Sequence, residues 1–109
     1  MRDFPQNVSL SEAQQWIKDM CEERGFNTNT DLQKFLLFSE EVGELAKAIR
    51  KVSGLHVEGA HSLEEKQKEL RGEFADVAMY LLDLANGFSV NLEAAIREKD
   101  EINKKRTWK

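Results

Sequence analysis

The sequence predicts an all-α protein, organised as an antiparallel four-helix bundle of the kind that oligomerisation completes. Its 109 residues include one Pro and six Gly, so little interrupts helix formation. Strand-like runs of β-branched and aromatic residues are scarce. Apolar residues recur at helical spacing in four stretches, each preceded by a candidate capping residue. The length fits one domain, residues 1–109, which would cover more apolar surface as an oligomer.

Capping boxes predict where the first two helices begin. Ser9 with Glu12 opens a helix that Gly25 is expected to end. Thr30 with Gln33 opens a second helix, which continues to about residue 52. The apolar residues of this second helix predict the face that it buries: Phe35, Phe38, Val42, Leu45, Ala46 and Ile49.

The second half of the chain predicts two more helices. Ser62 with Glu65 opens a helix to about residue 86, with Gly87 as its stop. Asn91 is the expected N-cap of a fourth helix, which runs to about residue 106. Residues 54–61 form the one extended loop between helices, and its histidines, His56 and His61, are expected to be exposed. The predicted buried face of the third helix contains Leu70, Phe74, Val77, Ala78, Leu81, Leu82 and Ala85.

Composition excludes several classes of function. The net charge of −4 argues against a binder of nucleic-acid polymers or anionic membranes, because such proteins present basic surfaces. No apolar run has transmembrane length. The single cysteine, Cys21, excludes an internal disulfide and occupies an apolar position, so we expect a buried thiol. These features predict a cytoplasmic protein.

Two pairs of acidic residues interrupt the apolar helices. Glu41 and Glu44 lie three residues apart, as do Glu73 and Asp76, so each pair shares a helix face within about 60°. Both pairs border the predicted buried faces, where packed helices could bring them together. Carboxylates this close repel unless a cation intervenes. Four oxygen ligands without His or Cys suit a hard cation, Mg²⁺ with Mn²⁺ as a substitute. The alternative is two solvated acidic helix faces.

These motifs resemble a known family. Residues 36–45 contain Glu-x-x-Glu and residues 73–81 contain Glu-x-x-Asp, which resemble the signature helices of MazG-type nucleotide pyrophosphohydrolases, in the all-α NTP pyrophosphatase superfamily. Lys99, Asn103 and Arg106 are similar to the family's closing Lys-x-x-x-Asn-x-x-Arg helix. The resemblance covers residues 30 to 108 and implies a homodimer or a dimer-of-dimers tetramer.

The resemblance also implies a reaction. Bound Mg²⁺ would activate water for attack at the α-phosphorus of a nucleoside triphosphate, releasing a nucleoside monophosphate and pyrophosphate. Such an activity would suit house-cleaning of the nucleotide pool. The implied metal ligands are Glu41, Glu44, Glu73 and Asp76. The candidates for a direct catalytic role, including acceptance of the water's proton, are Glu40, Glu41 and Glu44, although Glu40 also reads as a plain exposed acid.

The implied substrate-binding residues each have a plainer alternative. Lys99, Asn103 and Arg106 share one helix face suited to phosphate, but they also fit an exposed basic helix end. Tyr80 follows Asp76 by one turn and would line the nucleotide pocket or the core edge, while Lys34 would reach a phosphate or solvent. No residue identifies the base, and the role of Trp108 stays open. The alternative function is a non-catalytic helical binding or regulatory module that retains the acidic metal site.

Overall fold

A computed structural model describes residues 3–54 and 62–106, and within these ranges every regular element is a helix. The helices are α1 (Leu10–Arg24), α2 (Asp31–Val52), α3 (Leu63–Gly87) and α4 (Leu92–Lys104). The all-α prediction is therefore confirmed. None of these described helices combines the length and hydropathy that crossing a bilayer requires. Of the loop predicted at residues 54–61, residues 55–61, with both histidines, lie outside the described residues, as does Trp108.

The helices begin at the predicted caps. Ser9 and Thr30 each close a full capping box, with the hydroxyl oxygen accepting from the backbone N–H three residues on. The Ser62 and Asn91 side chains accept from the N–H groups of Glu65 and Ala94, which fixes the first turns of α3 and α4. Local side-chain chemistry thus determines where all four helices start.

Two helix ends depend on backbone conformation. Gly25 ends α1 in the left-handed region, with φ +73°, as predicted. Helix α3 ends at Gly87, one residue beyond the predicted end at about residue 86, but the residue in the left-handed region is Ser89, with φ +56°, and not Gly87. A Cβ on Gly87 would lie 2.5 Å from an oxygen of Asp31, so glycine here lets α3 pass close to the start of α2.

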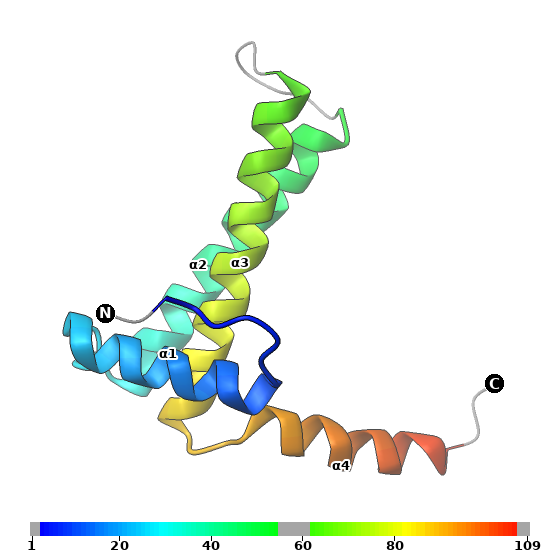
Figure 1. The fold of residues 1–109 in the computed structure, drawn as a ribbon. Coiled ribbons are helices and arrows are strands. Elements are labelled where there is room, and N and C mark those ends of the chain that lie inside the picture. The colour runs from blue at the N-terminus through cyan, green and yellow to red at the C-terminus, as the bar shows by residue number, and fades with distance from the viewer. Residues whose placement is uncertain (1–2, 55–61, 107–109) are drawn as a thin grey trace.

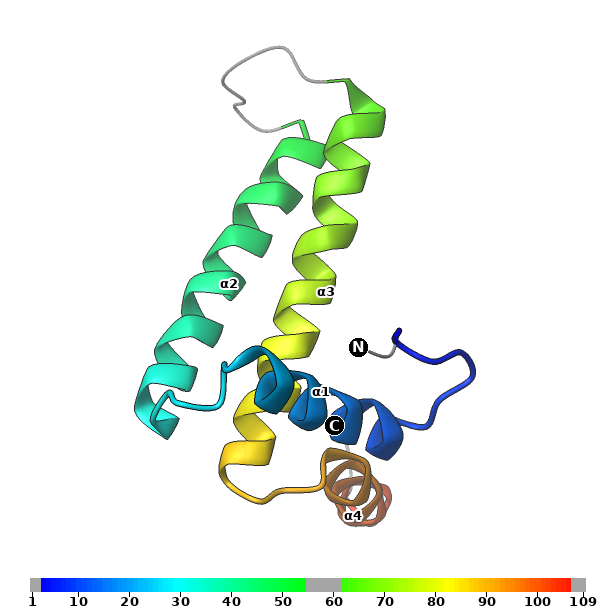
Figure 2. The ribbon, with the colours of Figure 1, turned by 60° about the vertical axis from the view of Figure 1, so that its left-hand side comes forward.

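Helices α2 and α3 form a long antiparallel hairpin, which Figure 2 shows along most of its length. Two ion pairs mark its register. Near the loop end, Lys51 Nζ lies 3.0 Å from Glu69 Oε1, and near the opposite end Lys34 Nζ lies 3.3 Å from Asp83 Oδ1. Between these pairs the same register places the middle of α2, which carries Glu41, against the middle of α3.

The buried core lies where α1 crosses the hairpin near the C-terminal end of α3 (Figure 1). Ile17 is 1% exposed and packs with Leu82 of α3, in a cluster completed by Ala13, Met20 and Cys21. The one buried polar side chain among the described residues, Gln14, donates to Asn86 Oδ1 and the Val90 carbonyl and accepts from the Leu92 N–H. Its amide therefore ties α1 to the turn between α3 and α4.

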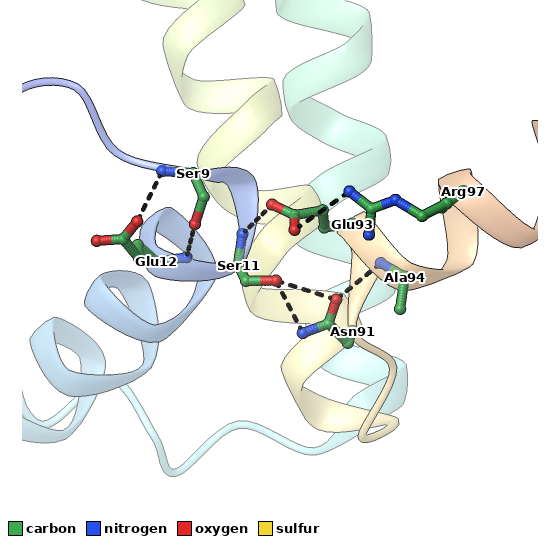
Figure 3. Close-up of polar contacts among 7 residues, drawn as sticks. All are labelled: Ser9, Ser11, Glu12, Asn91, Glu93, Ala94 and Arg97. Carbon is green, nitrogen blue, oxygen red and sulfur yellow. Dashed lines mark hydrogen bonds and ion pairs between the residues drawn. The ribbon is translucent and has the colours of Figure 1, made fainter.

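Polar contacts between the N-termini of α1 and α4 fix the direction of α4 (Figure 3). The Ser11 N–H donates to Glu93 Oε1 at 3.1 Å, and the Ser11 hydroxyl bonds to the Asn91 amide group. Arg97 pairs in turn with Glu93 at 3.6 Å. Helix α4 packs against α1, and in Figure 1 it runs away from the hairpin.

One chain by itself does not form a closed bundle, and completion of the predicted four-helix bundle by oligomerisation stays a prediction. Its Cα radius of gyration is 16.8 Å, against about 13 Å for a compact domain of this size. Several residues predicted to be buried are exposed instead, because a two-helix hairpin covers only one narrow stripe of each helix. These residues are Phe35 (50% exposed), Val42, Ala46, Ile49, Phe74 (54% exposed), Ala78 and Leu81.

Candidate metal centre and adjoining cavity

Three of the four predicted metal ligands lie together midway along the hairpin. One carboxylate oxygen each from Glu41, Glu73 and Asp76 lies within 4.8 Å of the other two. Glu73 and Asp76 share a face of α3 because they are three residues apart, and the antiparallel register brings Glu41 of α2 to that face. We call these three side chains the acidic group. Their oxygen donors match what a hard divalent cation binds.

The acidic group carries a polar atom without a partner. Glu73 Oε2 is buried and accepts no hydrogen bond from any described residue. Leaving a charged acceptor in that state is costly, and native structures rarely do so without a functional reason. Burial, reinforced by the negative charges of Asp76 and Glu73, raises the pKa of the Glu41 carboxyl. Both observations fit residues arranged to hold a cation.

The other two acids of α2 lie differently. Glu44, the fourth predicted ligand, is exposed and outside the acidic group. It is close enough for its charge to contribute to the raised pKa of Glu41. Glu40 is exposed and also outside the group. Their proposed roles as ligand and as proton acceptor remain predictions.

A cavity of about 280 Å³ adjoins the acidic group. Asp76 belongs to both, so the cavity opens directly beside the carboxylates. Most of its wall is apolar and comes from α1 and α3, with the α1–α2 connection and α2 completing it. The apolar lining residues are Ile17, Met20, Phe26, Leu37 and Met79.

Tyr80 is a lining residue of this cavity, whereas Lys34 pairs with another lining residue, Asp83. Tyr80 lines it, and burial together with the charges of Glu41 and Asp76 raises the pKa of its phenol, which keeps the hydroxyl neutral. Lys34, a predicted phosphate ligand, is instead paired with Asp83, with both side chains largely covered at 12% and 15% exposed. Its ammonium is therefore engaged inside the fold.

Asp83 and Cys21 are cavity residues that the sequence did not single out for function. The Cys21 thiol lies 3.7 Å from Asp83 Oδ1 and donates to it. Burial, followed by the charge of Asp83, raises the pKa of this thiol to about 11, so it stays protonated. One signal in the sequence could have identified Asp83, because it extends the stripe of Glu73, Asp76 and Tyr80 by one more turn of α3.

The predicted phosphate-binding residues of the last helix do not reach the acidic group within one chain. Lys99 and Asn103 lie on α4, Arg106 follows it, and α4 packs on α1 and points away from the hairpin. Trp16 of α1 packs edge-on against Phe4 at a ring distance of 5.2 Å and donates to the Asp3 carbonyl. The Trp16 ring therefore packs against the N-terminal segment.

Comparisons with known proteins bear on this site. The family model of the MazG nucleotide pyrophosphohydrolase domain matches residues 28–107. Among curated proteins, the chain is similar to the uncharacterized protein YvdC of Bacillus subtilis (strain 168), with 30% identity over 102 residues, 91% of this chain and 96% of that protein. The family match includes the acidic group on α2 and α3, whereas α1, which supplies part of the cavity wall, precedes it.

Proposed function

The chain belongs to the MazG nucleotide pyrophosphohydrolase family, and on this premise we propose that it is a Mg²⁺-dependent nucleoside triphosphate pyrophosphohydrolase. It would cleave the bond between the α-phosphorus and the oxygen that bridges the α- and β-phosphates. Water supplies the new oxygen on the α-phosphorus, so the products are a nucleoside monophosphate and pyrophosphate.

The convergence of Glu41, Glu73 and Asp76, with an unpartnered Glu73 oxygen among them, is the observation that carries this proposal. A solvated acidic face would leave each carboxylate pointing into water. Here the three oxygens face one another from two helices, which is unfavourable for like charges without a counter-charge. A triphosphate is also strongly negative, so a cation held by this group would provide the attraction that the acids alone cannot.

A bound divalent cation would neutralise charge on the phosphate and lower the pKa of a water molecule. The remaining tasks fall to this chain's own side chains. Glu41, Glu73 and Asp76 are held on two helices that pack against each other. The positions of these carboxylates are therefore set before substrate binds. Glu44 lies one turn after Glu41 and is exposed, which suits it to complete the ligand set or to accept the proton of the attacking water. Glu40 is the alternative acceptor.

The phosphate-binding roles of Lys99, Asn103 and Arg106 require a second copy of the chain in this proposal. Helix α4 is held away from its own hairpin by the Ser11, Asn91 and Glu93 contacts, so it is placed to lie against a neighbour. The exposed apolar residues of α2 and α3, such as Phe74 and Val42, offer that neighbour a surface. A homodimer, or a tetramer made of two such dimers, would cover them.

The test is pyrophosphate release from ribo- and deoxynucleoside triphosphates, with Mg²⁺ and with a chelator. We expect turnover only with Mg²⁺, and its loss in Glu41→Gln and Glu73→Gln. Glu98→Gln, an exposed acid on α4, is the matched control and should retain turnover. In Glu44→Gln, a rise in the Mg²⁺ concentration needed for half-maximal rate would assign Glu44 as a ligand. A lower rate at saturating Mg²⁺ would assign it as the base. No turnover of any triphosphate would favour the non-catalytic module.

A further inference from the structure

We propose that the cavity beside the acidic group is the base subsite, and that Asp83 makes it select nucleotides whose base carries an exocyclic amino group. This inference rests on the proposed function and specifies its substrate class. Cytosine and adenine nucleotides would be preferred over their carbonyl counterparts, uracil and hypoxanthine.

The position and size of the cavity indicate what occupies it. Asp76, Tyr80 and Asp83 follow one face of α3 and all three line the cavity, which begins at the acidic group. Asp76 and Asp83 are separated by about 10 Å along the helix axis, at 1.5 Å per residue. A molecule with its phosphates at the acidic group would therefore extend its other end toward Asp83. A volume of about 280 Å³ is small for a ligand pocket, which suits a base and not a whole triphosphate.

The cavity presents a hydrogen-bond acceptor at that far end. Asp83 lies among apolar walls, and its carboxylate is held by Lys34 and by the Cys21 thiol, both of which contact Oδ1. An ionised carboxylate accepts about four hydrogen bonds and donates none. The two observed contacts use only part of this capacity, and neither involves Oδ2.

An acceptor of this kind discriminates between base edges. An exocyclic amino group donates N–H to a carboxylate oxygen, and a hydrogen bond to a charged group is worth a factor of about 10 to 150 in affinity. A carbonyl at the same ring position brings two acceptors face to face, which leaves the carboxylate unpaired and repels the ligand. Asn29, which also lines the cavity, carries an amide that can donate to a ring acceptor.

The test compares two matched substrate pairs, dCTP with dUTP and dATP with dITP, by pyrophosphate release in Mg²⁺. We expect the amino-bearing member of each pair to have a kcat/KM at least about tenfold higher, mainly through KM. Asp83→Asn should reduce both ratios to within about threefold, because an amide both donates and accepts. Asp100→Asn, an exposed acid paired with Lys104 on α4, should leave both ratios unchanged. Circular dichroism checks that each variant is folded.

Equal rates within both pairs in the parent protein, or a preference for dUTP and dITP, would overturn the base assignment and leave the pyrophosphohydrolase activity standing. An unchanged ratio in folded Asp83→Asn would overturn the role of Asp83. Calorimetric binding of the products dCMP and dUMP gives an independent reading. If no triphosphate is hydrolysed but dCMP binds at least tenfold more tightly than dUMP, the proposed function fails and the base preference stands.

Discussion

Replacing Glu73 by Gln should separate the electrostatic cost of the acidic group from its capacity to bind metal. Two unit charges 4.8 Å apart repel by about 0.9 kcal/mol in water and by about 3.5 kcal/mol at an effective dielectric constant of 20. Glu73 takes part in two of the three close pairs within the group. Because Asp76 is exposed, values toward the lower end apply.

Without metal, we therefore expect Glu73→Gln to be as stable as the parent protein or more stable by up to about 2 kcal/mol. For a domain of this size, 1 kcal/mol corresponds to about 4–8 °C in Tm. With Mg²⁺ at about 100 times its Kd, the parent should gain about 2.7 kcal/mol by mass action. The variant should lose most of this gain, since it lacks one of the three converging carboxylates.

The measurement is thermal unfolding followed by circular dichroism, in chelator and in a Mg²⁺ titration, with Glu98→Gln as the charge-matched control. The control should melt like the parent in both conditions. A Glu73→Gln variant that melts lower without metal and keeps the full Mg²⁺-induced rise would refute the reasoning. That result would mean that the three carboxylates neither repel one another appreciably nor bind the ion together.

Three other predictions concern the rest of the molecule. The Cys21 thiol, with its pKa raised to about 11 from an ordinary 9.0, should contribute stability that is complete below pH 9 and lost as pH rises through 11. The rate of alkylation of this single cysteine should therefore rise with a midpoint near pH 11. A midpoint of the alkylation rate near pH 9 would contradict the raised pKa. Gly25→Ala should lower the free energy of unfolding by about 1 kcal/mol, because Gly25 has φ +73° and the strain is one of backbone conformation, with no atom near the Cβ position. Gly72→Ala, inside α3, should leave the stability unchanged or raise it. Equal melting temperatures for the two variants would contradict this. Light scattering at micromolar concentration should give the mass of a dimer or tetramer, and Phe74→Glu should lower it; a parent protein that is monomeric would exclude the assembly.

The candidate site was partly predictable because part of it is local. Glu73 and Asp76 share a face of α3 through their spacing alone, and Tyr80 follows on the same stripe. Whether Glu41 or Glu44 of α2 faces them depends on the hairpin register and on side-chain rotation, which no local pattern determines. The structure brings Glu41 into the group and leaves Glu44 outside it.

Lys34 and Asp83 illustrate the same limit. The helical positions of Lys34 and Asp83 indicate which face each shares, but they do not show that the two side chains pair with each other or that both are covered. Only tertiary packing covers both side chains and pairs them, and it brings Asp83, with its Cys21 contact, to the cavity wall. Phe74 and Val42 were expected to be buried and are exposed. Their helical spacing indicates an apolar face, but spacing does not determine whether the same chain or another molecule covers that face.

The sequence by itself determined the helical class, the four helix starts and the acidic stripe of α3, because capping and helical periodicity act between residues a few positions apart. Tertiary structure alone decided which acid of α2 joins that stripe, where the cavity lies and which way α4 points. Those features depend on contacts between residues far apart in the chain, such as Ser11 with Glu93 and Lys34 with Asp83. Their geometry exists only once the helices have packed.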